Sequence, residues 1–182
     1  MFFKRTSIIG AVSCLLLTGC SVVSTILPDR AITNVLSGRE GSNGPVLVVK
    51  IDDTTQAHPQ IGLEDADIVY IEQVEGGLTR LAAVFSSVIP QRIGPVRSAR
   101  ISDIEIMSQF GRVAFAYSGA QQKLLPVIAA ANLQDLGAQR QSPTIFTTDP
   151  NRRQPYAMVL RADLLMQEIK DKNFQIDSAK NV

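Results

Sequence analysis

The sequence predicts a single α/β domain in which a mixed β-sheet with a central hairpin is flanked by helices. Residues 46–51 form a continuous, β-branched apolar run, which is typical of a strand buried on both faces. Gly76 and Gly77 separate two further strand-like segments and indicate a hairpin. Beyond residue 100, apolar residues recur at helical spacing between shorter strand-like runs, an alternation typical of α/β proteins.

The hairpin is predicted to join strands at 67–74 and 79–88 through a turn at 75–78. The paired glycines supply the positive φ angles that such turns need. The apolar residues of 67–74 do not alternate strictly with polar ones, so we expect this strand to be mostly buried. In the resulting ribbon, Arg80 should lie near Glu72 or Glu75.

Helices are predicted on the carboxyl side of the hairpin. From Arg100 onward the apolar spacing favours a helix, which Ser98 or Ser102 would cap and Gly111 would end. The remaining predicted elements are a buried strand at 112–117, a helix at 118–131 kinked by Pro126, a short strand at 144–147 and a helix at 161–170.

The first twenty residues are typical of an export signal. Two basic residues precede an apolar run at 8–17, which is shorter than the roughly 20 residues that span a bilayer. Leu-Thr-Gly followed by Cys20 resembles the bacterial lipobox, which implies cleavage before Cys20 and acylation of that residue. We therefore expect a protein anchored by lipid to the extracytoplasmic face of the cell membrane.

The predicted organisation follows from these signals. Residues 1–19 are assigned to the signal peptide, 20–44 to the lipidated Cys20 and a tether rich in Ser, Thr, Asn and Gly, 45–171 to the α/β domain and 172–182 to a polar tail. Removing 19 residues from 182 leaves 163, enough for one domain with a real core.

Composition excludes several classes of site. Cys14 and Cys20 are the only cysteines, and the signal and the lipid account for both, so no disulfide, catalytic thiol or zinc-thiolate site is expected. His58 is the only histidine, and we predict no metal or cofactor. The mature chain has 16 basic and 17 acidic residues, a balance that does not favour binding of nucleic acid.

Charge changes sign along the chain. Seven acidic residues between 52 and 75 are followed by five arginines between 80 and 112. At 93–100, a Gly-Pro break precedes a serine and two arginines, at a predicted junction of strand and helix where backbone amides and guanidinium groups could bind an anion. The predicted ligand-binding residues are Asp52, Asp67, Glu75, Arg80, Arg97, Ser98 and Arg100.

Three functions are compatible with this cluster. The first is binding of a polar or phosphorylated component of the cell envelope, such as a wall polymer, in a cleft between the acidic and basic residues. The second is a phosphotransferase- or hydrolase-like enzyme acting on phosphodiester or glycan bonds of envelope polymers. Arg97 and Arg100 would stabilise negative charge, and an acid such as Asp52 would assist proton transfer or a metal. The third is a scaffold for a protein partner, in which the charges only pair with one another.

Six motifs in order resemble the YerB-like family of bacterial lipoproteins, grouped as domain of unknown function 3048. They are Val-Val-Lys-Ile-Asp at 48–52, Pro-Gln with Gly-Leu at 59–63, Ala-Asp-Ile-Val-Tyr at 66–70, Val-Glu-Gly-Gly-Leu-Thr-Arg at 74–80, Gly-Pro-Val-Arg-Ser-Ala-Arg at 94–100 and Tyr-Ser-Gly at 117–119. The resemblance covers the amino-terminal domain of that family and implies an exported, membrane-anchored protein whose activity is not established.

The chain departs from the family pattern at several positions. Asp53 replaces an asparagine, His58 replaces an arginine, and Tyr156 with Ala157 replaces a His-Asn pair. Family members carry a second domain after this point, so the resemblance implies a shortened member that lacks it. A weaker similarity of order and spacing to the LytR-CpsA-Psr phosphotransferases suggests a phosphate ligand.

Overall fold

The fold is built on one mixed five-stranded sheet. The computed structural model describes residues 31–180; Cys20 and the predicted signal peptide lie outside them. The strand order is β2-β3-β1-β5-β6. The bounds are β1 Leu47–Asp52, β2 Ile68–Gln73, β3 Thr79–Phe85, β5 Val113–Ala116 and β6 Leu133–Asp135. β3 runs antiparallel to β1 and β2, whereas β1, β5 and β6 are parallel, so the predicted mixed sheet with a hairpin is confirmed.

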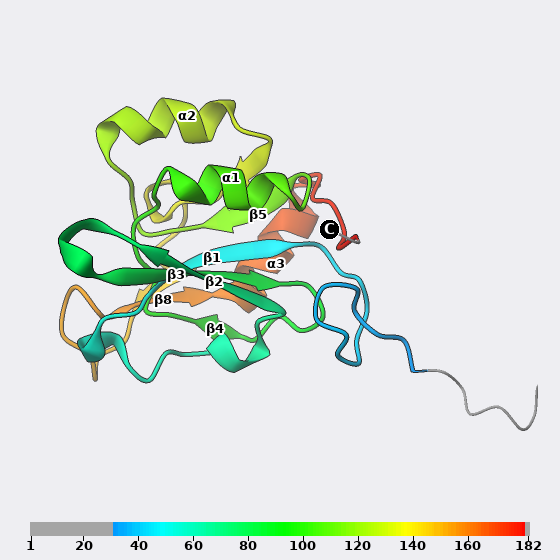
Figure 1. The fold of residues 1–182 in the computed structure, drawn as a ribbon, viewed down its shortest axis with the longest axis horizontal. Coiled ribbons are helices and arrows are strands. Elements are labelled where there is room, and N and C mark those ends of the chain that lie inside the picture. Colours follow the sequence, from blue (N-terminus) through cyan, green and yellow to red (C-terminus); the bar gives the residue numbers. More distant parts are fainter. Residues whose placement is uncertain (1–30, 181–182) are drawn as a thin grey trace, which may run out of the picture. The chain divides into compact units, whose positions relative to one another are not determined.

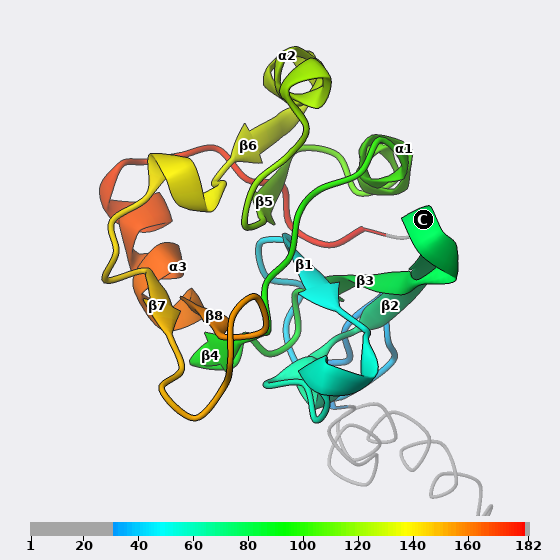
Figure 2. The ribbon, with the colours of Figure 1, turned by 90° about the vertical axis from the view of Figure 1, so that its left-hand side faces the viewer.

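A second, antiparallel sheet has the order β4-β8-β7. It consists of β4 Arg92–Ile93, β7 Phe146–Thr148 and β8 Met158–Arg161. The α-helices among residues 31–180 are α1 Ser102–Ser108, α2 Leu125–Ala130 and α3 Ala162–Asp171. Figure 1 and Figure 2 show α1 and α2 over one face of the five-stranded sheet, with α3 and the small sheet on the other side.

β1 separates two hydrophobic cores because its side chains alternate between the faces of the sheet. Leu47, Val49 and Ile51 pack with residues of the small sheet and α3. Val46 and Val48 pack with residues of α1, α2 and β5. Every residue of β1 is buried, as its apolar residues predict, and this includes the charged Lys50 and Asp52.

Two predictions about elements are wrong. β2 is an edge strand with alternating exposure, not a mostly buried one, because only β3 pairs with it. The segment 118–121 is irregular, and α2 begins only at Leu125, with Pro126 in its first turn. Proline is tolerated there because the first-turn amides have no partner within the helix, so Pro126 starts the helix and does not kink it.

Both ends of the described chain pack on the domain. Asn34, in the predicted tether, is buried, and its side-chain amide donates a hydrogen bond to the hydroxyl of Ser86, after β3, at 3.3 Å. In the predicted polar tail, the Asp177 carbonyl accepts from the Val46 amide at 3.0 Å, and the Ala179 amide donates to the Gly44 carbonyl at 3.0 Å. Among residues 31–180, no helix has the length and apolarity needed to cross a bilayer.

Candidate functional site

Charged side chains from three adjacent strands form a row at the carboxyl end of β1. Asp52, the last residue of β1, is opposite Arg80 of β3, and Arg80 is opposite Glu72 of β2. Directly paired residues share a face of a sheet. The carboxyl ends of parallel strands are common ligand sites in α/β proteins.

The Gly-Pro segment is inserted beside this row. The Asp52 amide donates to the Pro95 carbonyl at 2.9 Å, and the Arg97 amide donates to the Lys50 carbonyl at 2.8 Å. On its other side, the Arg97 carbonyl accepts from the Ser118 amide at 2.9 Å. At Gly94 a Cβ would lie 3.0 Å from the Met158 carbonyl oxygen, so a side chain there would crowd β8 and the close approach favours glycine. The segment therefore places Arg97 and Arg100 between the ends of β1 and β5.

Arg97 and Asp52 form an ion pair inside this arrangement. Arg97 Nε lies 2.6 Å from Asp52 Oδ2, although the N–H bond is not directed at that oxygen. The Asp52 side chain is 1% exposed, and its Oδ1 accepts a hydrogen bond from the Thr54 amide at 2.8 Å. Asp52 thus neutralises Arg97 and is almost closed to solvent.

Arg100 and Glu75 form a second, more exposed pair. Arg100 Nε and NH2 donate to Glu75 Oε2 at 3.0 and 2.8 Å. Gln121 Nε2 donates to Glu75 Oε1 at 3.5 Å. Hydrogen bonds from its own backbone amide and from Arg100 lower the pKa of Glu75, so this carboxylate is held in its charged form.

Arg80 differs from the other two arginines. Its NH1 donates to the Ser98 carbonyl at 3.2 Å, and no ion pair joins it to a carboxylate among residues 31–180. Burial, followed by the positive charges of Arg100 and Arg97, lowers the pKa of Arg80. Three guanidinium groups therefore lie within electrostatic reach of one another, with two carboxylates paired to two of them.

The predicted site residues are only partly brought together. Asp52, Glu75, Arg80, Arg97, Ser98 and Arg100 lie at this edge, and Ser98 contributes its backbone carbonyl to Arg80. Asp67 lies at the opposite end of β2. Its carboxylate accepts hydrogen bonds from the Ser86 and Ser87 amides at 2.7 and 2.8 Å and from the hydroxyls of Ser37 and Ser87. Its inclusion in the site is therefore corrected: Asp67 fixes the loop that follows β3.

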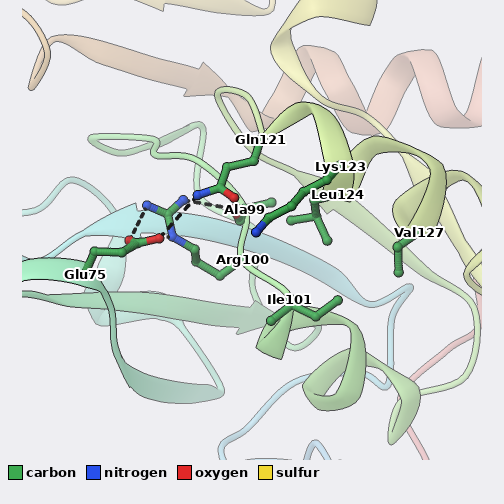
Figure 3. Close-up of a pocket in the computed structure, with 8 residues that line it drawn as sticks. All are labelled: Glu75, Ala99, Arg100, Ile101, Gln121, Lys123, Leu124 and Val127. Carbon is green, nitrogen blue, oxygen red and sulfur yellow. Dashed lines mark hydrogen bonds and ion pairs between the residues drawn. The ribbon is translucent and has the colours of Figure 1, made fainter.

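A pocket of about 390 Å³ opens beside Arg100 (Figure 3). Its volume is within the range of small-molecule sites. It is lined by Glu75, Ala99, Arg100, Ile101, Gln121, Lys123, Leu124 and Val127. Arg80 and Arg97 do not line its wall; they lie in the row at the end of β1. Lys123 adds a cation that the sequence analysis missed, because a single exposed lysine in a loop carries no signal.

Sequence reasoning also missed a buried charge cluster beneath the site. The Lys50 side chain is 0% exposed, its Nζ lies 2.8 Å from Asp103 Oδ1, and it also contacts Glu72. Ser102 donates to the other oxygen of Glu72, and the Arg100 amide donates to Asp103 Oδ2 at 2.6 Å. The cluster thus holds residues 100–103, which carry part of the pocket wall. A lysine inside a strand predicted to be buried on both faces was the available signal, because a buried ammonium group requires carboxylate partners.

The pKa values of the two carboxylates in this cluster, Asp103 and Glu72, are shifted in opposite directions. Burial raises the pKa of Asp103 to about 6 against the favourable charge of Lys50. Burial also opposes ionisation of Glu72, but hydrogen bonds from Lys50 and Ser102 lower its pKa overall. Two carboxylates share one ammonium group, so Asp103, the more buried of the two, is the one that protonates first.

Two positions at which the chain departs from the family pattern contact each other. His58 Nε2 lies 3.4 Å from Asp53 Oδ1, and Asp53 Oδ2 accepts a hydrogen bond from Thr79 Oγ1 at 2.6 Å. No three histidine, cysteine, aspartate or glutamate side chains within 31–180 are grouped in a way that could hold a metal ion.

Comparison with known proteins identifies the family. The model of the family described as "Protein of unknown function (DUF3048) N-terminal domain" matches residues 32–175. The "Putative lipoprotein YerB" of Bacillus subtilis (strain 168) is 41% identical over 75 residues, which are 41% of this chain and 22% of that protein. The crystal structure of YerB protein from Bacillus subtilis has a TM-score of 0.71 at 24% identity, over 82% of this chain and 53% of that chain.

These matches confirm the resemblance found in the motifs. The chain spans less than two thirds of the length of either relative, and the match to the solved structure shows the fold alone because its sequence identity is low. The family model, in contrast, covers most of the residues that the structure describes. The chain belongs to the DUF3048 family, through that family's amino-terminal domain.

Proposed function

We propose that this domain binds an anionic, phosphate-bearing component of the cell envelope at the edge formed by Arg80, Arg97, Arg100 and Lys123. The bound phosphate would accept hydrogen bonds from guanidinium groups, whose planar donors match phosphate oxygens in pairs. The proposal keeps the predicted Asp/Arg cleft but assigns its carboxylates to holding the arginines in place.

The observation that carries the proposal is the state of Arg80. A half-buried guanidinium group within electrostatic reach of two others, with a backbone carbonyl as its hydrogen-bond partner, is disfavoured by its burial and by the like charges of Arg100 and Arg97. The nearby negative charges of Asp52 and Glu75 offset this only in part, because the pKa of Arg80 is still lowered. An arriving anion would relieve that repulsion. Structural ion pairing explains Asp52–Arg97 and Glu75–Arg100 but not Arg80, so the scaffold hypothesis accounts for less of the site.

The enzyme hypothesis receives less support from the geometry. It named Asp52 as an example of an acid that assists proton transfer or a metal, and this carboxylate is buried and paired with Arg97. A general base must reach the proton that it removes. Binding is therefore the function that these residues support best.

The proposed location follows from the predicted anchor. The similarity to a protein named as a lipoprotein supports lipidation of Cys20 and placement of the domain on the extracytoplasmic face of the cell membrane. A diacylated cysteine would keep the site close to polymers and lipids of the envelope.

The test is a titration of residues 21–182 with poly(glycerol phosphate). Both cores and every strand of the described structure lie within this segment. We expect binding that weakens as salt is added, and at least about tenfold weaker binding for Arg80→Gln and for Arg100→Gln, because each removes a charge-assisted hydrogen bond.

The matched control is Arg39→Gln, which makes the same change of charge at an exposed position in the loop before β1. It should leave the affinity unchanged. An equal loss of affinity in all three variants would indicate a general effect of net charge. Failure of the wild-type protein to bind the polymer would refute the proposal.

A further inference from the structure

The pocket beside Arg100 has two chemically different ends. Figure 3 shows Glu75, Arg100 and Gln121 at one end, with the Lys123 side chain extending toward Arg100. Ile101 and Leu124 lie on the side away from Glu75, and Val127 lies farthest from it. The pocket is therefore cationic and polar at one side and apolar at the other.

Two aliphatic side chains at the apolar end of the pocket are more exposed to solvent than is usual for such residues. Ile101 is 64% exposed and Val127 is 40% exposed, although both are β-branched aliphatic residues. Exposed apolar groups that gather around a hollow are typical of binding sites. They come from two separate elements, the residue before α1 and the middle of α2, so neither helix alone explains them.

The apolar wall is fixed from below. Ala99 and Leu124 are buried in the core under α1 and α2, and the Ala99 amide donates to the Gly119 carbonyl at 2.9 Å. Ile101 follows Arg100, whose amide is held by Asp103 at 2.6 Å. Arg100, at the polar end of the pocket, and Ile101, at the apolar end, are thus adjacent residues of one segment that these hydrogen bonds hold in place. A ligand that contacts Arg100 therefore lies next to Ile101.

Charge complementarity selects the ligand. Arg100 and Lys123 supply two positive charges at the polar end, and Glu75 supplies one negative charge there. The excess is positive, so the polar end favours an anion, and the apolar end favours hydrocarbon that is removed from water.

We infer that the phosphate-bearing ligand is a lipid, with its phosphate at Arg100 and Lys123 and the first part of its hydrocarbon chain against Ile101, Leu124 and Val127. This inference rests on the proposed function, because it places the phosphate at Arg100 and Lys123, two of the four cations of the proposed edge. It adds that the envelope component is amphiphilic and that binding takes a chain out of water.

The experiment measures binding of a series of monoalkyl phosphates, from methyl through butyl and octyl to decyl phosphate, to residues 21–182. Each ligand is used below the concentration at which it forms micelles. Affinity should rise with chain length by up to about fourfold for each methylene that is fully buried, and should level off when the pocket is filled.

Variants separate the two ends of the pocket. Ile101→Ser and Val127→Ser should reduce the gain per methylene and leave binding of methyl phosphate unchanged. Arg100→Gln should weaken binding of every phosphate by a similar factor. Ile71→Ser is the matched control, since Ile71 is 71% exposed on edge strand β2, and it should change neither quantity.

Each outcome decides between the two claims. Methyl phosphate that binds through Arg100, with no gain from longer chains, would overturn the lipid inference and leave the proposed function standing. A chain-length gain that survives Ile101→Ser and Val127→Ser would place the hydrocarbon elsewhere and also overturn the inference. Failure of all the phosphates to bind would contradict both.

Discussion

At the scale of single residues, burial decides which charges can act. Lys50 and Asp52 are neighbours on one strand and are both closed to solvent, yet each has carboxylate or guanidinium partners. A buried ion pair is costly to break because the remaining charge loses its partner and cannot reach water. These residues therefore hold the site in place, while the partly buried Arg100 and the exposed Lys123 line the pocket in which a ligand would lie.

Replacing the buried ammonium group should be strongly destabilising. In Lys50→Met, Glu72 and Asp103 would remain buried without a counter-charge, and we expect the free energy of unfolding to fall by about 3–5 kcal/mol in urea titrations. Lys170→Met removes the same group from an exposed helix position and should cost far less. A loss below about 1 kcal/mol for Lys50→Met would contradict the described burial.

The pKa of Asp103 predicts how stability changes with pH. Burial raises this pKa from 3.8 to about 6 in the folded protein, so near pH 5 the folded chain keeps a proton that the unfolded chain has released. This group therefore stabilises the folded state as pH falls from 7 to 5, by about 1 kcal/mol. The lowered pKa of Glu72 acts in the opposite direction, but only near and below its ordinary value of 4.5.

The measurement is urea unfolding at pH 7, 6 and 5 of the wild-type protein and of Asp103→Asn. The wild type should gain stability relative to the variant as the pH is lowered through this window. A difference between the two proteins that is independent of pH would show that Asp103 does not titrate near pH 6.

Residue-level prediction from the sequence succeeded where a local rule applied. Arg97 and Arg100 follow a Gly-Pro break, and the structure brings them to the strand ends that carry Asp52 and Glu75. Asp67 was misplaced although the predicted hairpin already separated it from Glu75. With a strand at 67–74 and a turn at 75–78, Asp67 lies at the end of the strand away from the turn, where the structure has it before β2.

At the scale of elements, the hairpin brings Glu75 to Arg100. Gly76 and Gly77 both have φ of +73°, and a Cβ at either position would meet no atom within 4 Å. The cost of a side chain there is therefore conformational and not steric. The sequence revealed this turn because paired glycines between two strands have few other structural uses.

The hairpin glycine can be tested without disturbing its surroundings. Gly77→Ala should lower the free energy of unfolding by about 1 kcal/mol, since the left-handed backbone region penalises any Cβ. Gly119→Ala is the control, because its φ is not in that region and its new Cβ would have only ordinary contacts. Equal stability of both variants in thermal unfolding would contradict the turn geometry.

The prediction of secondary-structure elements failed where burial depends on the order of the strands in the sheet. The apolar content of 67–74 suggested burial, but β2 has only one neighbour, and Ile71 remains exposed on its free face. Strands β4, β6 and β8 were not predicted, because they have two to four residues and are too short for a periodic pattern.

At the scale of the whole molecule, segments distant in sequence complete the domain. Asp177 links the start of β1 to the start of β5: its carbonyl accepts from the Val46 amide, and its carboxylate accepts from the Arg112 amide at 2.9 Å. Composition alone suggested a polar tail, because pairing across more than one hundred residues leaves no local signature. The same long-range assembly places Arg80, Arg97 and Arg100 at one edge of the domain, although Arg80 belongs to β3 and the other two arginines follow the Gly-Pro break.

The central claim is that this edge is a binding site and not a set of structural ion pairs. The most direct measurement is the affinity of Arg80→Gln for poly(glycerol phosphate), on protein whose free energy of unfolding is determined in parallel. If the edge is a binding site, this variant binds the polymer at least about tenfold more weakly, with stability unchanged or raised, because it removes a charge that is partly buried and repelled by Arg100 and Arg97. Unchanged affinity together with a clear loss of stability would contradict it and assign Arg80 to the scaffold.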